Sequence, residues 1–173
     1  MADSTLSAPI RLLVVDDHAV VRAGFSSVLR HQEDLEVVGS VQSGEDALTF
    51  LERCSADVSL LDLHMPGMSG IKTLLALQEL PCPPKVIVLS SCEPDEEICR
   101  AVETGAVGYL RKDISCTEIV EAVNTVHAGK TYFPQWIRDR VPVVFSAAVA
   151  LIASLVASVF TDDIGTLLYL IGT

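Results

Sequence analysis

Positive charge is scarce in this sequence. Its 173 residues contain 12 lysines and arginines against 23 aspartates and glutamates, which gives a formal net charge of −11. Contacts with phosphates dominate nucleic-acid affinity, so DNA is not expected to be a partner of this chain. The length fits one domain of ordinary size together with a smaller segment, and two domains of full size are not expected.

The chain also lacks paired cysteines and a secretory signal. Its five cysteines form no Cys-x-x-Cys pair, so the sequence suggests neither a zinc site nor a disulfide framework. The first nine residues do not show the basic-then-apolar order of a signal peptide. We therefore expect residues 1–9 to be a flexible leader and the domain that follows to lie in the cytoplasm with reduced cysteines.

Apolar runs that suit buried strands alternate with segments of helical period from residue 10 onward. The alternation predicts an α/β domain over residues 10–132, and helix caps at Ser43 and Ser115 support it. The expected fold is a flavodoxin-like, doubly wound, five-stranded parallel sheet of order 2-1-3-4-5. Its five predicted strands cover residues 11–15, 35–41, 58–63, 85–90 and 108–111.

Polar residues end four of these strands. Asp16 and Asp17 follow the first strand, Asp62 ends the third, Ser90 ends the fourth and Lys112 follows the fifth. The carboxyl ends of parallel strands meet at one edge of a sheet, so these side chains are expected to converge there. Carboxylates packed so closely repel one another unless a hard divalent cation neutralises them. The sequence therefore predicts a Mg²⁺ site formed by the three aspartates.

Four motifs in order, with fitting spacing, carry a resemblance to a known family: "LLVVDDHAVVRAGF", "LLDLHMPGMSGI", "KVIVLSS" and "GAVGYLRKD". Residues 10–132 resemble the receiver domain of bacterial two-component response regulators, and within them the NarL/FixJ branch. The resemblance implies a phosphorylation-dependent signalling switch rather than a turnover enzyme. It also implies a partner that donates the phosphoryl group, either a sensor histidine kinase or a phosphotransfer protein.

Carried over to this sequence, the resemblance makes Asp62 the phosphoryl acceptor. Asp16 and Asp17 then hold Mg²⁺ beside it, and the backbone carbonyl of His64 adds a further ligand. The two adjacent aspartates also have a simpler interpretation as a solvated turn. We expect the His64 side chain to face solvent and assign no metal role to His18, since neutral imidazole is a poor ligand for Mg²⁺.

Three further roles come from the resemblance. Lys112 is expected to pair with the acyl phosphate, and Ser90 is expected to hydrogen-bond its oxygen. Tyr109 is then the aromatic switch whose rotamer follows Ser90. The simpler interpretations are a surface lysine, a serine that only ends its strand and a half-buried aromatic residue.

The resemblance stops after the receiver. Residues 133–140 are expected to be a linker, and no lysine or arginine follows Arg140. The helix-turn-helix usual in this branch is therefore not expected. An alternative function is a NarL/FixJ-type transcriptional regulator whose DNA-binding output is degenerate, truncated or supplied by a partner. An aspartyl-phosphate phosphatase fits less well, because His64 occupies the position of its usual second acid.

Residues 141–160 form a hydrophobic stretch. As a helix they would measure about 30 Å, the thickness of the hydrocarbon core of a bilayer. We predict a C-terminal hydrophobic helix that anchors the receiver to the inner face of the membrane. A stripe of small residues along it suggests a homodimer, and two alternatives remain open, namely packing on the receiver or a remnant without a role. Residues 161–173 are a short apolar tail. The stripe consists of Ser146, Ala150, Ser154 and Ser158.

Overall fold

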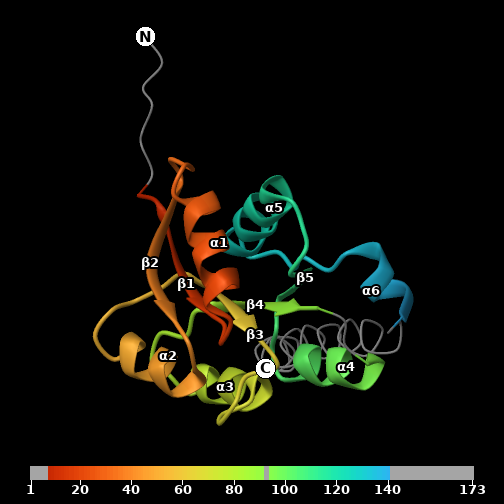
Figure 1. The fold of residues 1–173 in the computed structure, drawn as a ribbon. Coiled ribbons are helices and arrows are strands. Elements are labelled where there is room, and N and C mark those ends of the chain that lie inside the picture. The colour runs from red at the N-terminus through yellow and green to blue at the C-terminus, as the bar shows by residue number, and fades with distance from the viewer. Residues whose placement is uncertain (1–7, 92–93, 141–173) are drawn as a thin grey trace, which may run out of the picture.

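The structure is a computed structural model, and it describes residues 8–91 and 94–140. Strands and helices alternate along the chain, and a sixth helix follows the last alternation (Figure 1). The strands are β1 (Ile10–Val15), β2 (Leu35–Val41), β3 (Val58–Asp62), β4 (Lys85–Ser90) and β5 (Gly108–Arg111). The helices are α1 (Ala19–Leu29), α2 (Gly44–Leu51), α3 (Gly70–Gln78), α4 (Asp95–Glu103), α5 (Cys116–His127) and α6 (Gln135–Arg140).

The five strands form one parallel sheet in the order β2-β1-β3-β4-β5, which confirms the predicted fold. Helices α1 and α5 lie on one side of the sheet, and α2, α3 and α4 lie on the other (Figure 1). The central strands are covered on both faces, which explains why β3 is buried along its whole length. Only at the ends of β3 can side chains contact a ligand.

Alternate residues of each strand enter two different core clusters. In β1, Leu13 and Val15 pack on the α2–α4 side, whereas Leu12 and Val14 pack on the α1 and α5 side. Successive side chains of a strand point to opposite faces, so an unbroken apolar run fills both clusters at once. Burial on both faces fixes the sheet and therefore the positions of the strand ends.

Local signals set the helix boundaries as the sequence predicted. The Ser43 side chain accepts a hydrogen bond from the Asp46 amide at 3.1 Å, and the Ser115 side chain accepts one from the Glu118 amide at 3.3 Å. Gly105 ends α4 with a φ of 106°, a left-handed conformation that favours glycine. These caps fix the ends of the helices and therefore the bounds of the loops between strands and helices.

The segment over residues 133–140, predicted to be a linker, contains a short helix. This helix is α6, and the side chains of Phe133 and Ile137 are buried in the core cluster on the α2–α4 side. Tyr132 forms a parallel bridge with Gly108 of β5. Phe133 precedes α6 and Ile137 lies within it, and both side chains enter the same core cluster. Residues 132–137 are therefore packed on the domain.

Two predictions fall outside the described residues. The hydrophobic helix over residues 141–160 and the tail over residues 161–173 both lie there, so both stay predictions. Within residues 8–91 and 94–140, no helix combines the length and the hydrophobicity needed to cross a bilayer.

Candidate functional site

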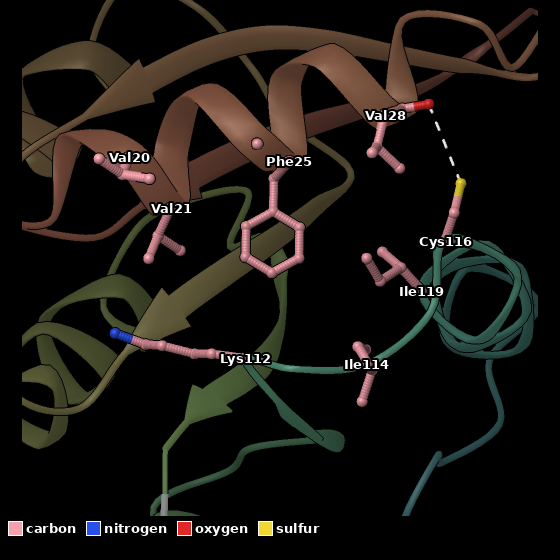
Figure 2. Close-up of a pocket in the computed structure, with 9 residues that line it drawn as sticks. Val20, Val21, Phe25, Val28, Lys112, Ile114, Cys116 and Ile119 are labelled. Carbon is pink, nitrogen blue, oxygen red and sulfur yellow. Dashed lines mark hydrogen bonds between the residues drawn. The ribbon is translucent and has the colours of Figure 1, made fainter.

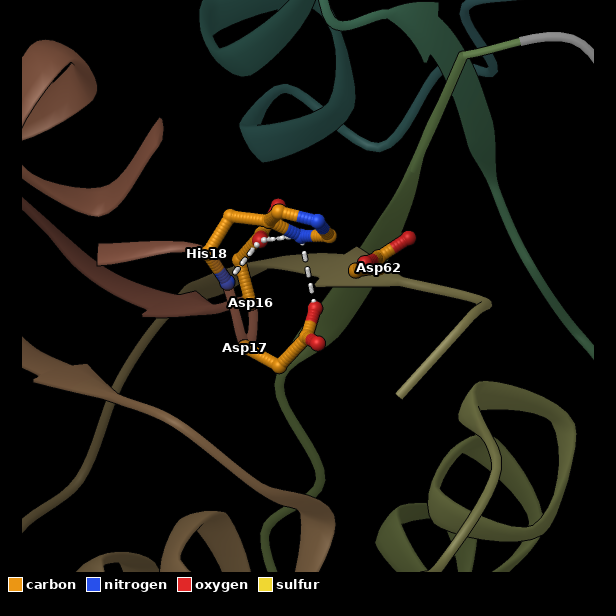
Figure 3. Close-up of side chains that lie close together, drawn as sticks. All are labelled: Asp16, Asp17, His18 and Asp62. Carbon is orange, nitrogen blue, oxygen red and sulfur yellow. Dashed lines mark hydrogen bonds and ion pairs between the residues drawn. The ribbon is translucent and has the colours of Figure 1, made fainter. Parts of the chain in front are cut away.

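Three aspartates meet at the carboxyl edge of the sheet (Figure 3). Asp16 and Asp17 follow β1, and Asp62 is the last residue of β3. One ligand atom from each of these residues and one from His18 all lie within 4.8 Å of one another. Asp16 and Asp62 are fully buried or nearly so. The strands thus bring together the three carboxylates that the sequence predicted to converge.

Lys112 is the counter-ion of this cluster. Its ammonium lies 2.8 Å from Asp16 Oδ2 and 2.7 Å from Asp62 Oδ2. The Lys112 amide donates a hydrogen bond to the Ser90 carbonyl at 2.8 Å, which extends the pairing of β4 with β5 by one residue. This backbone bond fixes the point from which the side chain reaches the carboxylates.

The aliphatic stem of Lys112 crosses an apolar groove. Residues of α1 and α5, among them Val21, Phe25 and Ile119, line this groove, and Figure 2 shows the lysine reaching past them from the end of β5. The side chain is only 13% exposed. The apolar groove packs around the stem, and the ammonium group at its end pairs with the carboxylates.

Burial and pairing shift the two central ionisable groups. Burial raises the pKa of the Asp62 carboxyl above its usual value, although the Lys112 ammonium and the His64 amide act in the opposite direction. Burial also acts to lower the pKa of Lys112, but its hydrogen bonds to Asp16 and Asp62 outweigh this and raise that pKa. The contacts with the carboxylates therefore favour the charged form of Lys112, whereas burial disfavours the charged form of Asp62, which further positive charge would stabilise.

Arg22, which the sequence analysis did not single out, and His18, to which it gave no metal role, hold the loop after β1. The Arg22 guanidinium donates hydrogen bonds to the carbonyls of Asp16 and Asp17, at 2.7 and 3.0 Å. The His18 amide donates to Asp16 Oδ1 at 2.8 Å, and its Nδ1 lies 2.7 Å from Asp17 Oδ1. The position of Arg22, one turn into the helix that follows the two acids, was the available signal. Arg22 and His18 fix the loop that presents both carboxylates.

Backbone geometry fixes the loop after Asp62. The His64 amide donates a hydrogen bond to Asp62 Oδ1 at 3.1 Å, and Gly67 has a φ of 80°, which only glycine adopts readily. Gly70, the first residue of α3, packs directly on the backbone of Asp62 and Leu63. A methyl group at Gly70 would collide with the Asp62 carbonyl. The start of α3 is thus part of the support for the candidate acceptor.

An ion pair borders the cavity at Asp62. Nε2 of His64 lies 3.3 Å from Oε2 of Glu97, which belongs to the first turn of α4. Both side chains line the cavity that reaches Asp62 and Lys112. The His64 side chain is 59% exposed, as expected for a loop histidine, but the contact with α4 was not predicted.

Ser90 and Tyr109 share one face of the sheet. Val88 is the partner of Tyr109 in the pairing of β4 with β5, so Ser90, two residues further on, is its diagonal neighbour. Ser90 is 1% exposed and Tyr109 is completely buried. The Tyr109 ring meets the Trp136 ring edge to face, with 5.9 Å between centroids and 84° between planes. Burial excludes the simpler interpretation of Tyr109 as a half-buried aromatic residue.

The donor set fits a hard divalent cation. It offers three carboxylates within a few ångströms, and a single ammonium balances only part of their charge. Oxygen ligands of this kind suit Mg²⁺, which keeps part of its water shell and binds through a small number of carboxylates. Asp16, Asp17 and Asp62 are the residues that would hold it. His18 contributes to the cluster as a hydrogen-bonding neighbour of the acids rather than as a preferred ligand.

Comparison with known proteins gives a consistent result. The pattern of the family described as response regulator receiver domain matches residues 12–124. The chain is 37% identical over 131 residues to the response regulator GacA of Pseudomonas aeruginosa, a match that covers 76% of this chain and 61% of GacA. It is 34% identical over 122 residues to the nitrate/nitrite response regulator protein NarL of Escherichia coli strain K12, covering 70% of this chain and 56% of NarL. The matches thus span about three fifths of these curated relatives.

Solved structures agree with the sequence matches. The signal receiver domain of NarL from Mycobacterium tuberculosis superimposes with a TM-score of 0.68 at 34% identity, over 72% of this chain and all of that one. The response regulator ChrA of a heme-sensing two-component system gives a TM-score of 0.64 at 31% identity, over 78% of this chain and 65% of that one.

Proposed function

The chain belongs to the response regulator receiver family, and from this premise we propose that Asp62 accepts a phosphoryl group from a partner histidine kinase. A receiver domain of this family is a phosphorylation-dependent switch and not a classical turnover enzyme. The observation that carries the assignment is the environment of Asp62. Its carboxylate ends β3, borders a cavity and lies 2.7 Å from the Lys112 ammonium beside two further acids.

The transfer follows from this arrangement. A carboxylate oxygen of Asp62 attacks the phosphorus of the donor's phosphohistidine, so a P–O bond forms while the P–N bond to the donor breaks. Lys112 exchanges its contact with the carboxylate for one with a phosphoryl oxygen, which neutralises charge in the transition state. Asp16, Asp17 and Asp62 would hold Mg²⁺, which when bound would supply further positive charge for the transfer. Asp62 needs no general base because it reacts in its ionised form.

Ser90 and Tyr109 are the proposed switch. The Ser90 hydroxyl donates a hydrogen bond to an oxygen of the new phosphoryl group, and this movement clears space beside its diagonal neighbour Tyr109. A phosphoryl group acts in this way when it adds strong acceptor oxygens to a site with a nearby donor. The surface formed by α4 and β5 then changes its affinity for a partner.

Labelling with a small phosphodonor tests the acceptor. The full chain incubated with acetyl phosphate and Mg²⁺ is expected to gain one hydroxylamine-sensitive phosphoryl group by intact mass. The Asp62→Asn variant is expected to gain none. Asp113→Asn is the matched control, because Asp113 lies beside Lys112 but pairs with Arg111 at the surface. Labelling that persists in Asp62→Asn places the acceptor elsewhere and contradicts the proposal.

Control of transcription is the second candidate. It is favoured by the relatives, since the chain matches NarL-family regulators over about three fifths of their length. The net charge of −11 argues against a DNA contact made by this chain. A mobility-shift experiment on a promoter fragment distinguishes the two. We expect no retardation by the phosphorylated chain, and retardation that depends on Asp62 favours the second candidate.

A further inference from the structure

Tyr132 pairs with the outer edge of β5 through an isolated parallel bridge to Gly108, and helix α6 follows it. The Tyr109 amide donates a hydrogen bond to the Tyr132 carbonyl, and the Tyr132 amide donates one to the Val107 carbonyl, both at 2.9 Å. The chain after α5 therefore runs along the outer edge of β5, where Tyr109 is located. This contact occupies backbone groups of the strand that carries the proposed switch residue.

Helix α6 is held in place by buried side chains. Ile137 is completely buried and Phe133 is 9% exposed, and both belong to the same core cluster as Tyr109 and as Ile98 of α4. A six-residue helix is too short to be stable by itself, so its position depends on these contacts. A rearrangement of side chains in this cluster must therefore change how α6 packs on the domain.

Trp136 makes the direct connection between α6 and the switch. Its ring meets the Tyr109 ring edge to face at 5.9 Å. Tyr109 has no exposed surface, and Trp136 packs against the cluster that encloses it. Tyr109 cannot leave the core on this side unless Trp136 moves. The rotamer of Tyr109 and the packed position of α6 therefore depend on each other.

We propose that Trp136 is a positioning residue for Tyr109, and that α6 carries the phosphorylation state of Asp62 to the chain after Arg140. This inference rests on the proposed function and extends it. When Ser90 is drawn toward the phosphoryl group, space opens diagonally beside Tyr109, and the buried ring with Trp136 seated on it becomes the favoured state. The signal leaves the receiver through α6 because that helix is the element that connects Tyr109 to the following segment.

Coupling of this kind acts in both directions. If phosphorylation favours the seated form of Trp136, then the seated form must favour phosphorylation by the same factor. The stabilisation provided by an edge-to-face aromatic pair changes an equilibrium constant by roughly two- to tenfold. Loss of the Trp136 ring should therefore weaken the equilibrium binding of a phosphoryl mimic at Asp62.

The chain offers a direct probe, because Trp136 is its only tryptophan. The full chain with Mg²⁺ is treated with acetyl phosphate, or with beryllofluoride as a phosphoryl mimic, while acrylamide quenching of its fluorescence is measured. Quenching is expected to fall in proportion to the phosphorylated fraction determined by intact mass. Mg²⁺ alone, and the Asp62→Asn variant with all reagents, are expected to leave it unchanged.

Substitutions then separate positioning from stability. Trp136→Ala is expected to weaken the binding of beryllofluoride, measured by titration calorimetry with Mg²⁺ present, roughly two- to tenfold, and Trp136→Phe, which keeps a ring, is expected to restore most of the affinity. Arg138→Ala is the matched control on an exposed position of the same helix. Circular dichroism verifies that each variant is folded. A purely structural Trp136 would lower the thermal midpoint without changing the affinity for beryllofluoride.

The outcomes separate this inference from the proposed function. Absence of phosphorylation at Asp62 overturns both. Full phosphorylation with unchanged quenching, or with increased quenching, overturns the coupling through Trp136 and leaves the acceptor assignment intact. An affinity of Trp136→Ala for beryllofluoride equal to that of the wild-type chain also overturns the coupling.

Discussion

The ammonium of Lys112 lies 2.7 Å from Oδ2 of Asp62, which joins the loop after β5 to the end of β3 across the intervening strand β4. The same ammonium contacts Asp16 after β1. One side chain therefore links three strand ends that are far apart in the sequence. This link holds the candidate acceptor in place before any phosphodonor arrives, which is how preorganised charge lowers the cost of phosphoryl transfer.

Replacement of Lys112 should be costly for folding. In Lys112→Met the apolar stem remains but two buried carboxylates lose their counter-ion, so we expect the free energy of unfolding at neutral pH to fall by about 3 kcal/mol. Because the folded state raises the pKa of Lys112 above 10.5, its stabilising contribution is present below pH 10.5 and is lost as the pH rises through the raised value. Urea unfolding at neutral and alkaline pH measures the difference between the two proteins.

The exposed Lys72→Met variant is the control for that experiment. It should unfold like the wild-type chain at both pH values, within about 0.5 kcal/mol. If Lys112→Met is equally stable, Lys112 does not compensate the buried acids in solution.

Magnesium should stabilise the folded chain in a pH-dependent manner. Bound Mg²⁺ raises the thermal midpoint because it binds only the folded arrangement of the acids. Burial raises the pKa of Asp62 above 3.8, so protons compete with the metal at pH values above that of an ordinary aspartate. The protonated form of Asp62 is favoured in the folded state. Its contribution to the free energy of unfolding is therefore lost as the pH rises through the folded pKa.

Thermal unfolding with and without Mg²⁺ over a series of pH values measures this effect. We expect the gain from Mg²⁺ to be full at neutral pH, to shrink as the pH falls toward the raised pKa of Asp62, and to be absent in Asp16→Asn. A gain that persists in Asp16→Asn would mean that the metal binds elsewhere.

Two glycines should respond in opposite ways to the same substitution. A methyl group at Gly70 collides with the backbone of Asp62 and Leu63, so Gly70→Ala is expected to cost about 1–3 kcal/mol. It should also slow phosphoryl uptake, because the Asp62 carbonyl must move. A methyl group at Gly24 in α1 would meet no neighbouring element within 4 Å, so Gly24→Ala is expected to stabilise the fold by about 0.5–1 kcal/mol. Chemical denaturation of both variants measures these changes in the free energy of unfolding. Equal changes in the two variants would contradict the contacts described for Gly70 and Gly24.

The ion pair between His64 and Glu97 should prolong the phosphorylated state. It connects the loop after β3 with the first turn of α4 beside the cavity at Asp62, so its loss should admit water more readily. Glu97→Gln is expected to shorten the half-life of the aspartyl phosphate roughly two- to fivefold, a range set by the weakness of exposed ion pairs. The half-life is measured after removal of the phosphodonor.

Glu96→Gln serves as the control, because Glu96 is exposed in the same turn of α4. A double variant with His64→Ala tests whether the two side chains act together. If they do, the second substitution should add little to the first. Fully independent effects would show that the pair is not the relevant feature.

Much of the fold was predictable because the sheet is buried on both faces. The predicted bounds of β2, β4 and β5 agree with the structure, and those of β1 and β3 differ by one residue at one end. Caps at Ser43 and Ser115 were recognisable because their hydrogen bonds span only three residues. The meeting of Asp16, Asp17 and Asp62 followed from strand order alone, since parallel strands that end together place their last residues together.

Other features were not predictable from spacing. The interaction of Arg22 with the loop carbonyls, the contact of His64 with Glu97 and the packing of Trp136 on Tyr109 all depend on where helices lie on the sheet. Residues 133–140 were predicted to be a linker because a helix of six residues carries too little periodicity to be recognised. Its stability comes from burial of Ile137, which only the folded domain provides.

The sequence by itself determined the layers, the strand order and the edge at which the acids gather, because these follow from hydrophobic patterning and from short-range caps. Only the tertiary structure decided which charges pair, which side chains border the cavity at Asp62, and that α6 packs on Tyr109. The reason is physical. Burial patterns repeat along the chain and can be read locally, whereas the partner of a side chain such as Lys112 is set by the distance between elements that are far apart in sequence.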